Sequence, residues 1–369
     1  MPKAFVAVIN DLVTDQRVHR TCLALQKAGY EVLLYGRRKR KSPAVESRDY
    51  QTKRIKLLFE KGMCFYACFN IRLFCHLIFH KYDLVVSNDL DTLPACYYAG
   101  KIRKSRLIYD SHEYFTGVPE LTGRTKTIRV WKFFEKRILP GLKHTMTVNS
   151  SVARLYCDEY SIGMKVVMNV PLPKDMNEDE RILEKYKLSN RSRYIIYQGA
   201  LNKDRGLEEL IGSMAYVPED LILLLAGDGD LTESLKKLAI DSGLEHKVRF
   251  LGRIPLGELH QVTMKALVGI SAEKDTNLNY HNSLPNKIFD YIQAGVPVLA
   301  SPFPEISHIF GRFEIGMLLK SHDMKEMGSL ITEMIENAAK REFWRVQLAE
   351  AAREYSWKNE EQKLLELIG

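Results

Sequence analysis

The segment 282–302 has residue types and spacing that suit the recognition of a nucleotide. Cap-type and first-turn residues predict a helix that begins near Asn286 or Lys287. The start of a helix presents unpaired backbone N–H groups and the positive end of the helix dipole, which together attract phosphate. Lys287 would add a cation there. Asp290, one turn further along, could accept hydrogen bonds from the two hydroxyls of a ribose, so the segment predicts a site for phosphate and ribose.

The segment 282–302 is also expected to include a strand of a sheet, which would fix the helix in place. Gly295 is expected to end the helix, and Val296–Ala300 is expected to form a buried strand. Loop–helix–strand units of this kind occur throughout α/β proteins, with or without a phosphate. The functional interpretation therefore depends on the rest of the chain.

Short apolar strands alternate with helices along the whole chain, which is typical of parallel sheets covered on both faces. The expected strands are 4–10, 31–35, 84–87, 107–109 and 145–148 in the first half, and 194–197, 221–226, 248–251, 268–271 and 296–300 in the second. The first helix is expected at 15–28, capped by Thr14 or Asp15.

The domain junction is expected in the stretch 168–181, which is rich in proline and then acidic. We therefore expect an acceptor-binding Rossmann-like domain at 1–170 and a nucleotide-sugar-binding Rossmann-like domain at 171–355. A helix at 356–369 is expected to pack back on the first domain. Two doubly wound α/β domains would face each other across a cleft at the carboxyl ends of their strands.

Composition agrees with a globular protein of two α/β domains. The chain has 369 residues, of which 46% are apolar and 27% charged. No signal peptide is visible at its start, because a strand-like run follows Lys3, so a cytoplasmic location is expected. The six cysteines follow no zinc or redox spacing and are expected to be reduced core residues.

Charge is distributed unevenly between the two halves. Residues 1–170 hold 29 Lys and Arg against 15 Asp and Glu, whereas residues 171–369 hold 25 against 31. Such an asymmetry favours an anionic partner for the first half. Nucleic acid is not expected, because no helix-turn-helix, zinc-finger or aromatic RNA-binding pattern is present. An anionic membrane face is the other candidate, and the basic run Arg37–Lys41 precedes a segment relevant to it.

Residues 57–79 form the most apolar window of the chain. Glu60, Lys61, Arg72 and His76 interrupt it, and a charge deep in a bilayer costs several kcal/mol. A half-buried helix with an apolar exposed edge is therefore expected rather than a membrane span. Two interpretations remain open, a plain core helix and a surface helix that contacts a membrane or a lipid acceptor.

Four segments of the second half resemble motifs of one enzyme family in order and spacing. Residues 197–211 resemble its G-R-L…K-G…L-I opening, residues 225–231 its G-D-G-P-L turn, residues 248–252 its V-x-F-x-G strand, and residues 282–300 its Glu-x7-Glu segment with the following A-x-G-x-P-V. The chain resembles, over nearly its whole length, the retaining glycosyltransferases of family four, which have the GT-B architecture of two Rossmann-like domains.

This resemblance implies a retaining hexosyltransferase that moves a sugar from a UDP- or GDP-sugar to a glycan or lipid-linked glycan, in surface polysaccharide or glycoconjugate synthesis. It implies no metal and no further cofactor, and a location at the inner face of the membrane. Because negative charge builds on the leaving diphosphate, cations and N–H groups aimed at it are the main catalytic lever. The acceptor hydroxyl would attack on the face that the diphosphate leaves, and a phosphate oxygen could take its proton.

The resemblance also implies residue roles in the second half. Arg205 matches a family lysine that contacts diphosphate, and Asp290 matches the second glutamate of the family pair, which holds ribose. Gly227 and Gly229 could serve a tight turn as much as the site, and Arg253 could be a surface cation. The complete donor set is Gly199, Arg205, Gly227, Gly229, Gly252, Arg253, Asn282, Ser283, Leu284, Asn286, Lys287 and Asp290.

Three loops at strand ends of the first half supply the acceptor or sugar side. They carry Asp11, Arg17, Asp89, Asp91, His112 and Glu113. His112 matches the family histidine beside the donor sugar, and with Arg205, Lys287 and Asp290 it forms the expected catalytic set. Helix capping or a salt bridge is the alternative for Asp11 and Arg17.

Two departures from the family pattern leave other functions open. Asn282 stands where the first glutamate of the pair is expected, and Ala200 stands where an arginine is expected, although Lys203 is close enough to substitute. A non-catalytic nucleotide-sugar-binding or scaffold subunit would fit these losses. An epimerase or a phosphorylase with pyridoxal phosphate would share the fold, whereas a dehydrogenase is disfavoured because no Gly-x-Gly-x-x-Gly follows the first strand.

Overall fold

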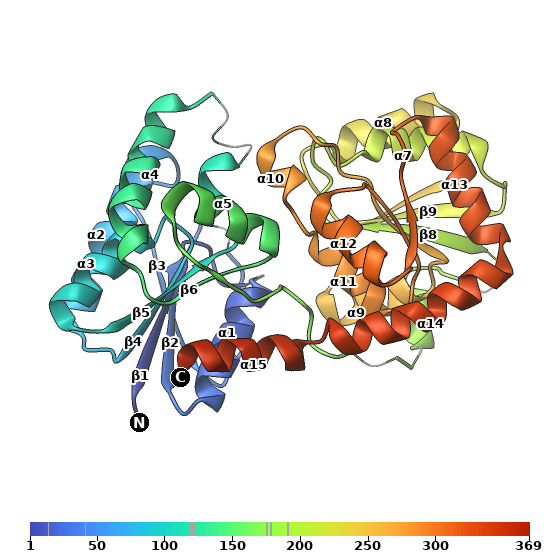
Figure 1. Ribbon diagram of the computed structural model, residues 1–369. Coiled ribbons are helices and arrows are strands. Elements are labelled where there is room, and N and C mark those ends of the chain that lie inside the picture. Colours follow the sequence, from blue (N-terminus) through green and yellow to red (C-terminus); the bar gives the residue numbers. More distant parts are fainter. Residues whose placement is uncertain are drawn as a thin grey trace. The chain divides into compact units, whose positions relative to one another are not determined.

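The computed structural model describes residues 1–13, 15–40, 42–118, 121, 123–174, 176–177, 179–189 and 192–369. Thr14, Lys41 and two positions of the expected junction, 175 and 178, lie outside this part. The described chain forms two compact α/β units (Figure 1). Unit 1 consists of Met1–Asn169 and Lys358–Gly369, and unit 2 consists of Val170–Trp357.

Unit 1 is built on a parallel sheet of seven strands in the order β3-β2-β1-β4-β5-β6-β7. The strands are β1 Lys3–Ala7, β2 Glu31–Arg37, β3 Gln51–Ile55, β4 Leu84–Asn88, β5 Arg106–Ser111, β6 Thr145–Thr147 and β7 Lys165–Val166. Its helices are α1 Gln16–Lys27, α2 Gly62–Phe79, α3 Leu93–Arg103, α4 Thr125–Ile138, α5 Ser150–Tyr160 and α15 Trp357–Ile368, with 3-10 turns η1 Phe115–Gly117 and η3 Leu139–Gly141. The strand order reverses between β1 and β4, the point where doubly wound sheets bind ligands.

Unit 2 repeats this topology with six strands in the order β10-β9-β8-β11-β12-β13. The strands are β8 Arg193–Gln198, β9 Leu221–Ala226, β10 Val248–Gly252, β11 Val268–Ser271, β12 Val298–Ala300 and β13 Gly316–Leu318. Its helices are α6 Glu180–Lys185, α7 Leu207–Ser213, α8 Thr232–Asp241, α9 Leu256–Met264, α10 Leu278–His281, α11 Asn286–Gln293, α12 Pro304–Arg312, α13 Met324–Glu336 and α14 Ala338–Glu354, with the 3-10 turn η4 Met214–Tyr216. The reversal here lies between β8 and β11.

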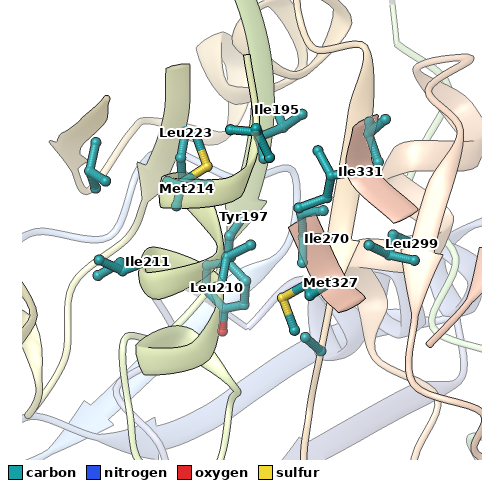
Figure 2. Packing of buried hydrophobic residues seen from close by; sticks show 14 of the residues in the cluster. Ile195, Tyr197, Leu210, Ile211, Met214, Leu223, Ile270, Leu299, Met327 and Ile331 are labelled. Carbon is teal, nitrogen blue, oxygen red and sulfur yellow. The ribbon is translucent and has the colours of Figure 1, made fainter. Parts of the chain in front are cut away.

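The largest core cluster of unit 2 packs residues of helices α7, α8, α13 and α14 against its sheet. Figure 2 shows strand residues such as Ile195, Leu223 and Ile270 packed against Leu210 of α7 and Ile331 of α13. These side chains are all fully buried. Such close packing holds the strands, and the loops that follow them, in fixed positions.

Local signals explain several element boundaries. Asp15 caps α1, since its side chain accepts a hydrogen bond from the Val18 N–H, and β9 and β11 have the predicted bounds. The helix predicted to begin at Asn286 or Lys287 begins at Asn286. Strand β3 was not predicted, because its residues are mostly polar and exposed and so carry no apolar pattern.

The last helix, α15, belongs to the compact unit formed by residues 1–169. The Arg106 guanidinium donates to the Leu367 carbonyl at 2.6 Å, and the Met168 N–H donates to Glu360 at 2.8 Å. Hydrogen bonds to charged groups are the stronger kind, so these contacts attach the chain end firmly to unit 1.

The prediction that the cysteines are core residues is wrong for most of them. Cys22 and Cys96 are buried, whereas Cys64, Cys75 and Cys157 are exposed and Cys68 is half-buried. Three of these four lie on α2, whose apolar sequence did not show which face would be buried. The helix buries one face only, and the cysteines lie off that face.

Helix α2 is half-buried, as the sequence predicted. Phe65, Phe69, Leu73 and Leu77 are its buried residues, and the last three pack in a core cluster of unit 1. Within the described residues, α2 is the one helix that is long and apolar enough to cross a membrane by length and composition alone, and 22% of it is buried. Glu60 and Lys61 precede its first residue.

Candidate active site

Glycines bring three loops close together at the carboxyl edge of the unit 2 sheet. Gly199 follows β8, Gly227 follows β9 and Gly252 ends β10. The Gly227 N–H donates to the Gly252 carbonyl at 2.8 Å. A Cβ on Gly227 would lie 1.8 Å from the Gly199 carbonyl oxygen, so no other residue fits there. Likewise, a Cβ on Gly229 would lie 2.5 Å from the Leu201 carbonyl oxygen, so both glycines are required by close backbone approach.

A buried carboxylate lies between two cations at the same edge, just after β11. Glu273 is fully buried, and its Oε1 accepts from Lys287 Nζ at 2.7 Å and from Arg205 Nη1 at 3.3 Å. Its Oε2 accepts from Ser271 Oγ at 2.7 Å. Burial alone would raise the pKa of Glu273, but Lys287, Ser271 and Arg205 outweigh it and lower the pKa to about 2. The carboxylate is therefore ionised, and one negative charge faces two positive ones.

We refer to Glu273, Lys287 and Arg205 as the unit 2 triad, and its two cations differ in how many partners they have. Lys287 is 8% exposed, and its Nζ contacts both Glu273 and the Tyr197 ring, whose centre is 3.8 Å away. The Arg205 guanidinium lies 4.8 Å from the centre of the Tyr280 ring, and its Nε is buried without a hydrogen-bond partner in the described chain. A buried donor without a partner is costly, so Arg205 is the group with capacity for a ligand.

Asp290 lies in the second turn of α11, on the side of β8. Its carboxylate accepts from Gln198 Nε2 at 2.9 Å and from Lys174 Nζ at 3.2 Å. Gln198 is itself fixed, since its Oε1 accepts from Thr263 Oγ1 at 2.8 Å. The helix starts after Pro285, which makes no side-chain capping bond. Asp290 and the first turn of α11 are thus both positioned at the carboxyl edge of the sheet.

Five other predicted donor residues have local partners or are at least partly exposed. Asn282 Nδ2 donates to the Leu278 carbonyl at 2.8 Å, and Ser283 Oγ donates to the Tyr280 carbonyl at 2.8 Å, so both side chains end α10. Asn286 is exposed and Leu284 half-buried at the start of α11. Arg253 is 80% exposed, with its Nε 3.5 Å from Asp228 Oδ2, which is the surface alternative named for it above.

In unit 1, His112 lies between two carboxylates where β4 and β5 end side by side. Its Nδ1 is 3.1 Å from Asp89 Oδ2 and its Nε2 is 3.4 Å from Asp110 Oδ2. The Asp89 backbone has a left-handed φ of 58°, and its Oδ1 accepts from the His112 N–H at 2.8 Å. Burial would lower the pKa of His112, but Asp89 and Asp110 raise it to about 10. The imidazole is therefore a cation at neutral pH and cannot act as a base.

Arg17 forms the salt bridge that was the alternative to ligand binding. Its Nε and Nη2 donate to the two oxygens of Asp110 at 2.9 and 2.6 Å, and its Nη1 donates to the Val167 carbonyl. Burial opposes ionisation of Asp110, but Arg17 and His112 lower its pKa to about 2. Asp11 accepts from Ser42 Oγ at 3.2 Å and from the Val13 N–H, so it shapes its own loop.

Asp91 differs from these paired groups. It is 6% exposed, and its Oδ1 is buried with no hydrogen-bond partner in the described part of the chain. Burial and the nearby Asp89 raise the pKa of Asp91 well above its usual range. Glu113 is half-buried in the loop that also carries His112. Asp91 is thus a buried carboxyl group that the fold itself does not use.

Sequence analysis did not identify Glu273, which lies 14 residues before Lys287. The available signal was an acid directly after a buried strand, at the end where ligands bind. Among the described residues, no three His, Cys, Asp or Glu side chains come together in a way that could hold a metal ion.

Two family models match the chain, one in each half. Residues 15–169 match the model described as Glycosyltransferase Family 4, and residues 178–354 match the model described as Glycosyl transferases group 1. Together they cover most of both units.

Individual relatives agree with these models. The chain is 27% identical to a phosphatidyl-myo-inositol mannosyltransferase of Mycobacterium leprae over 44% of this chain and 42% of that protein. The chain spans half or less of the length of the curated relatives it matches.

Solved structures match over the whole chain. The sucrose-phosphate synthase of Thermosynechococcus elongatus has a TM-score of 0.79 at 17% identity, covering 100% of this chain and 98% of the other. Anabaena HepE in complex with UDP-glucose has a TM-score of 0.77 at 16% identity, covering 100% and 99%. At these identities the likeness concerns the fold.

Proposed function

Since the chain belongs to the family-four glycosyltransferases with the GT-B fold, we propose that it transfers a hexosyl group, with retention of configuration, from a UDP- or GDP-sugar to a hydroxyl of a glycan or lipid-linked glycan. The structure of HepE with UDP-glucose supports a nucleotide-sugar donor. The name of the mycobacterial relative supports a lipid-linked acceptor.

The observation that carries this proposal is the surplus of positive charge around Glu273. Two cations share one carboxylate, and Arg205 keeps a buried Nε without a partner. Breaking the bond between the sugar and the diphosphate places negative charge on the leaving group. Donors fixed in a partly buried site stabilise that charge without having to reorganise. Arg205 would contact the diphosphate, while Lys287 and the first-turn N–H groups of α11 would complete the site.

Asp290 would hold the ribose of the donor. Its two carboxylate oxygens offer about four lone-pair positions, and Gln198 and Lys174 use two of them. Capacity for two ribose hydroxyls therefore remains. Because Gln198 and Thr263 fix the carboxylate in place, the ribose would meet a preorganised acceptor.

Unit 1 would bind the acceptor, with Asp91 as the partner of the reacting hydroxyl. A buried carboxyl group without a partner is what an incoming hydroxyl needs. His112, fixed as a cation between Asp89 and Asp110, would place a positive charge near the transferred sugar rather than accept a proton. The bond from the anomeric carbon to the phosphate oxygen breaks, the bond to the acceptor oxygen forms on the same face, and the acceptor proton passes to the phosphate oxygen.

The location follows from the acceptor. Lipid-linked acceptors lie at the cytoplasmic face of a membrane, and the cationic excess of residues 1–170 would favour an anionic bilayer. We therefore place the protein in the cytoplasm, peripherally attached to the inner face of the membrane.

A second candidate function is a nucleotide-sugar-binding subunit without turnover. Asn282 replaces the expected glutamate, and its amide is used within α10. Incubation with a panel of UDP- and GDP-sugars distinguishes the two functions. Release of free nucleotide by the wild-type protein, lost in Asp290→Ala and kept in the surface variant Lys236→Ala, supports transfer. Donor binding without any nucleotide release, with or without a lipid-linked acceptor, supports the subunit instead.

A further inference from the structure

Unit 1 leaves an apolar stripe of α2 uncovered. Met63, Ala67, Ile71, Cys75 and Phe79 follow one another at four-residue spacing along this helix and are all exposed, and we refer to them as the α2 stripe. Ile71 is 63% exposed and Phe79 is 79% exposed. Residues four apart lie on one face of a helix, so the stripe is continuous. A soluble surface rarely presents such a row without a partner.

The opposite side of α2 is held by the core of unit 1. Phe65, Phe69, Leu73 and Leu77 are buried there, and the last three share a core cluster with Tyr35 and Phe5 of the sheet. Crossing a bilayer would require pulling these four buried side chains out of unit 1. The helix is therefore fixed on the surface of unit 1, where its stripe could enter an interface but the helix could not span a membrane.

Neighbouring helices carry further exposed apolar and basic side chains. Figure 1 shows α2, α3 and α4 on the same side of the unit 1 sheet, and Tyr66 of α2 meets Trp131 of α4 edge to face at 5.2 Å. On α4, Phe133 is 63% exposed. Several exposed cations accompany these side chains on α3 and α4, namely Lys101, Arg103, Arg129, Lys136 and Arg137.

A basic pocket lies at the start of α2. It has a volume of about 390 Å³ and is lined by Arg38, Lys39, Arg40, Lys56, Leu57, Leu58 and Glu60. Glu60 approaches Arg40 at 3.7 Å, and the other three cations form no ion pair in the described chain. The pocket is attached to the stripe, because Arg72, next to Ile71, donates to the Lys56 carbonyl. We refer to these lining residues as the basic pocket.

We propose that the α2 stripe and the basic pocket together dock unit 1 on a bilayer that contains anionic lipids, with lipid phosphate in the pocket and the stripe among the acyl chains. The proposal deepens the proposed function, since it names the face that would meet a membrane holding a lipid-linked acceptor. Charge complementarity selects this occupant. Unpaired cations attract phosphate groups, and an adjoining apolar helix face needs a hydrocarbon phase that a nucleic acid does not offer.

The test is co-sedimentation of the full chain with vesicles of phosphatidylcholine alone and of phosphatidylcholine with phosphatidylglycerol. We expect binding to the anionic vesicles and at least about tenfold weaker binding to the neutral ones. Ile71→Glu with Phe79→Glu, and separately Lys39→Ala with Lys56→Ala, should each weaken binding about tenfold or more. Added salt should weaken the binding of the wild-type protein to anionic vesicles, and should weaken the binding of the Lys39→Ala with Lys56→Ala variant less.

Matched surface changes on unit 2 provide the controls. Val346→Glu replaces an exposed apolar residue of α14, and Lys236→Ala removes an exposed cation of α8, so both should bind vesicles like the wild type. Each variant is also checked for its melting temperature and for the shift of that temperature by UDP and GDP. A variant that melts early is replaced by the milder Ile71→Ser.

Three outcomes would overturn the proposal. The first is equal binding to neutral and anionic vesicles, and the second is unchanged binding by both variants. The third is no vesicle binding together with a concentration-dependent dimer that Ile71→Glu disrupts, since a second copy would then cover the stripe. Nucleotide binding separates this proposal from the proposed function. Vesicle binding without any response to nucleotides contradicts the donor site alone, and a nucleotide response without vesicle binding contradicts the docking face alone.

Discussion

The two units use the same sheet topology, but the charged clusters at their sheet edges leave opposite groups without a partner. In the unit 2 cluster, Glu273 is shared by two cations, and Arg205 Nε, a donor, is one of the buried atoms that have no hydrogen-bond partner in the described chain. In the unit 1 cluster, the cations Arg17 and His112 are matched by carboxylates, and Asp91 Oδ1, a carboxyl oxygen, is another of these atoms. A diphosphate requires donors and a hydroxyl requires an acceptor. The comparison therefore supports the proposed division of roles between the two units.

The largest expected effect comes from breaking the unit 2 triad. Lys287→Met would leave Glu273 fully buried, with Arg205 at 3.3 Å as its remaining cation. Removing one partner of a buried ion pair costs about 3–5 kcal/mol, so urea unfolding should show a loss of that size. Adding Glu273→Gln should recover most of it, because the fully buried group is then neutral and the remaining cation, Arg205, is 25% exposed.

The control for this change is Lys274→Met, which removes a cation from the partly exposed pair with Glu209. Exposed pairs contribute about 0–1 kcal/mol, so this variant should unfold close to the wild type. Equal losses in Lys274→Met and Lys287→Met would show that Glu273 is not the reason for the sensitivity of the site.

The next largest effect concerns the unpartnered donor itself. Arg205→Ala should lower the rate of nucleotide release from the donor sugar about 100-fold to 1,000-fold, as removal of one oxyanion donor does in other enzymes. Its melting temperature should change little, because Glu273 keeps Lys287 at 2.7 Å. An unchanged rate of nucleotide release in Arg205→Ala would show that the positive charge around Glu273 does not assist the reaction.

The corresponding test in unit 1 is Asp91→Asn. We expect kcat/KM for the acceptor to fall about tenfold to hundredfold, the effect of losing one hydrogen bond to a charged or acidic group. Nucleotide affinity should not change, because Asp91 belongs to unit 1. Asp158→Asn on the exposed side of α5 is the matched control. A drop in nucleotide affinity equal to the drop in kcat/KM would contradict the division of roles between the units.

The smallest expected effect is a difference in the pH range over which each cluster contributes to stability. The pKa of Glu273 is lowered from 4.5 to about 2, so its contribution is present above pH 4.5 and is lost as the pH falls towards 2. The pKa of His112 is raised from 6.5 to about 10, so its contribution is present below pH 6.5 and is lost as the pH rises through 10.

Variants separate the contribution of Glu273 to stability from that of His112. The difference in unfolding free energy between the wild type and Glu273→Gln should shrink only in acid, and the difference between the wild type and His112→Gln should shrink only in alkali. If both differences shrank at the same end of the pH range, the assignment of charge to one of the clusters would be wrong.

The sequence predicted the strands and helices that carry both clusters better than it predicted the contacts between their side chains. Strand β11, the start of α11 and the position of Asp290 follow from apolar runs and helix-start residues, which act locally. Glu273 could not be paired with Lys287 in advance, because the fold brings together an acid after β11 and a residue of α11. Asn282 is an expected donor residue, and its amide donates to the Leu278 carbonyl, a backbone contact that the sequence did not predict.

The exposed side of α2 is a second feature that the sequence alone did not predict. Its composition predicts a helix, but only the packing of the sheet decides which face is buried. Cys64 and Cys75 were therefore expected in the core and lie on the surface. Propensity and pattern fix elements, whereas burial depends on contacts between elements.

Calorimetric titration of UDP and of GDP into the wild type, Arg205→Ala and Lys236→Ala tests the central claim most directly, namely that the positive surplus around Glu273 holds a nucleoside diphosphate. We predict that the wild type and Lys236→Ala bind one of the two nucleotides equally, and that Arg205→Ala binds it at least about tenfold more weakly. Equal binding by Arg205→Ala and the wild type, or no binding of either nucleotide by the wild type, would contradict the claim.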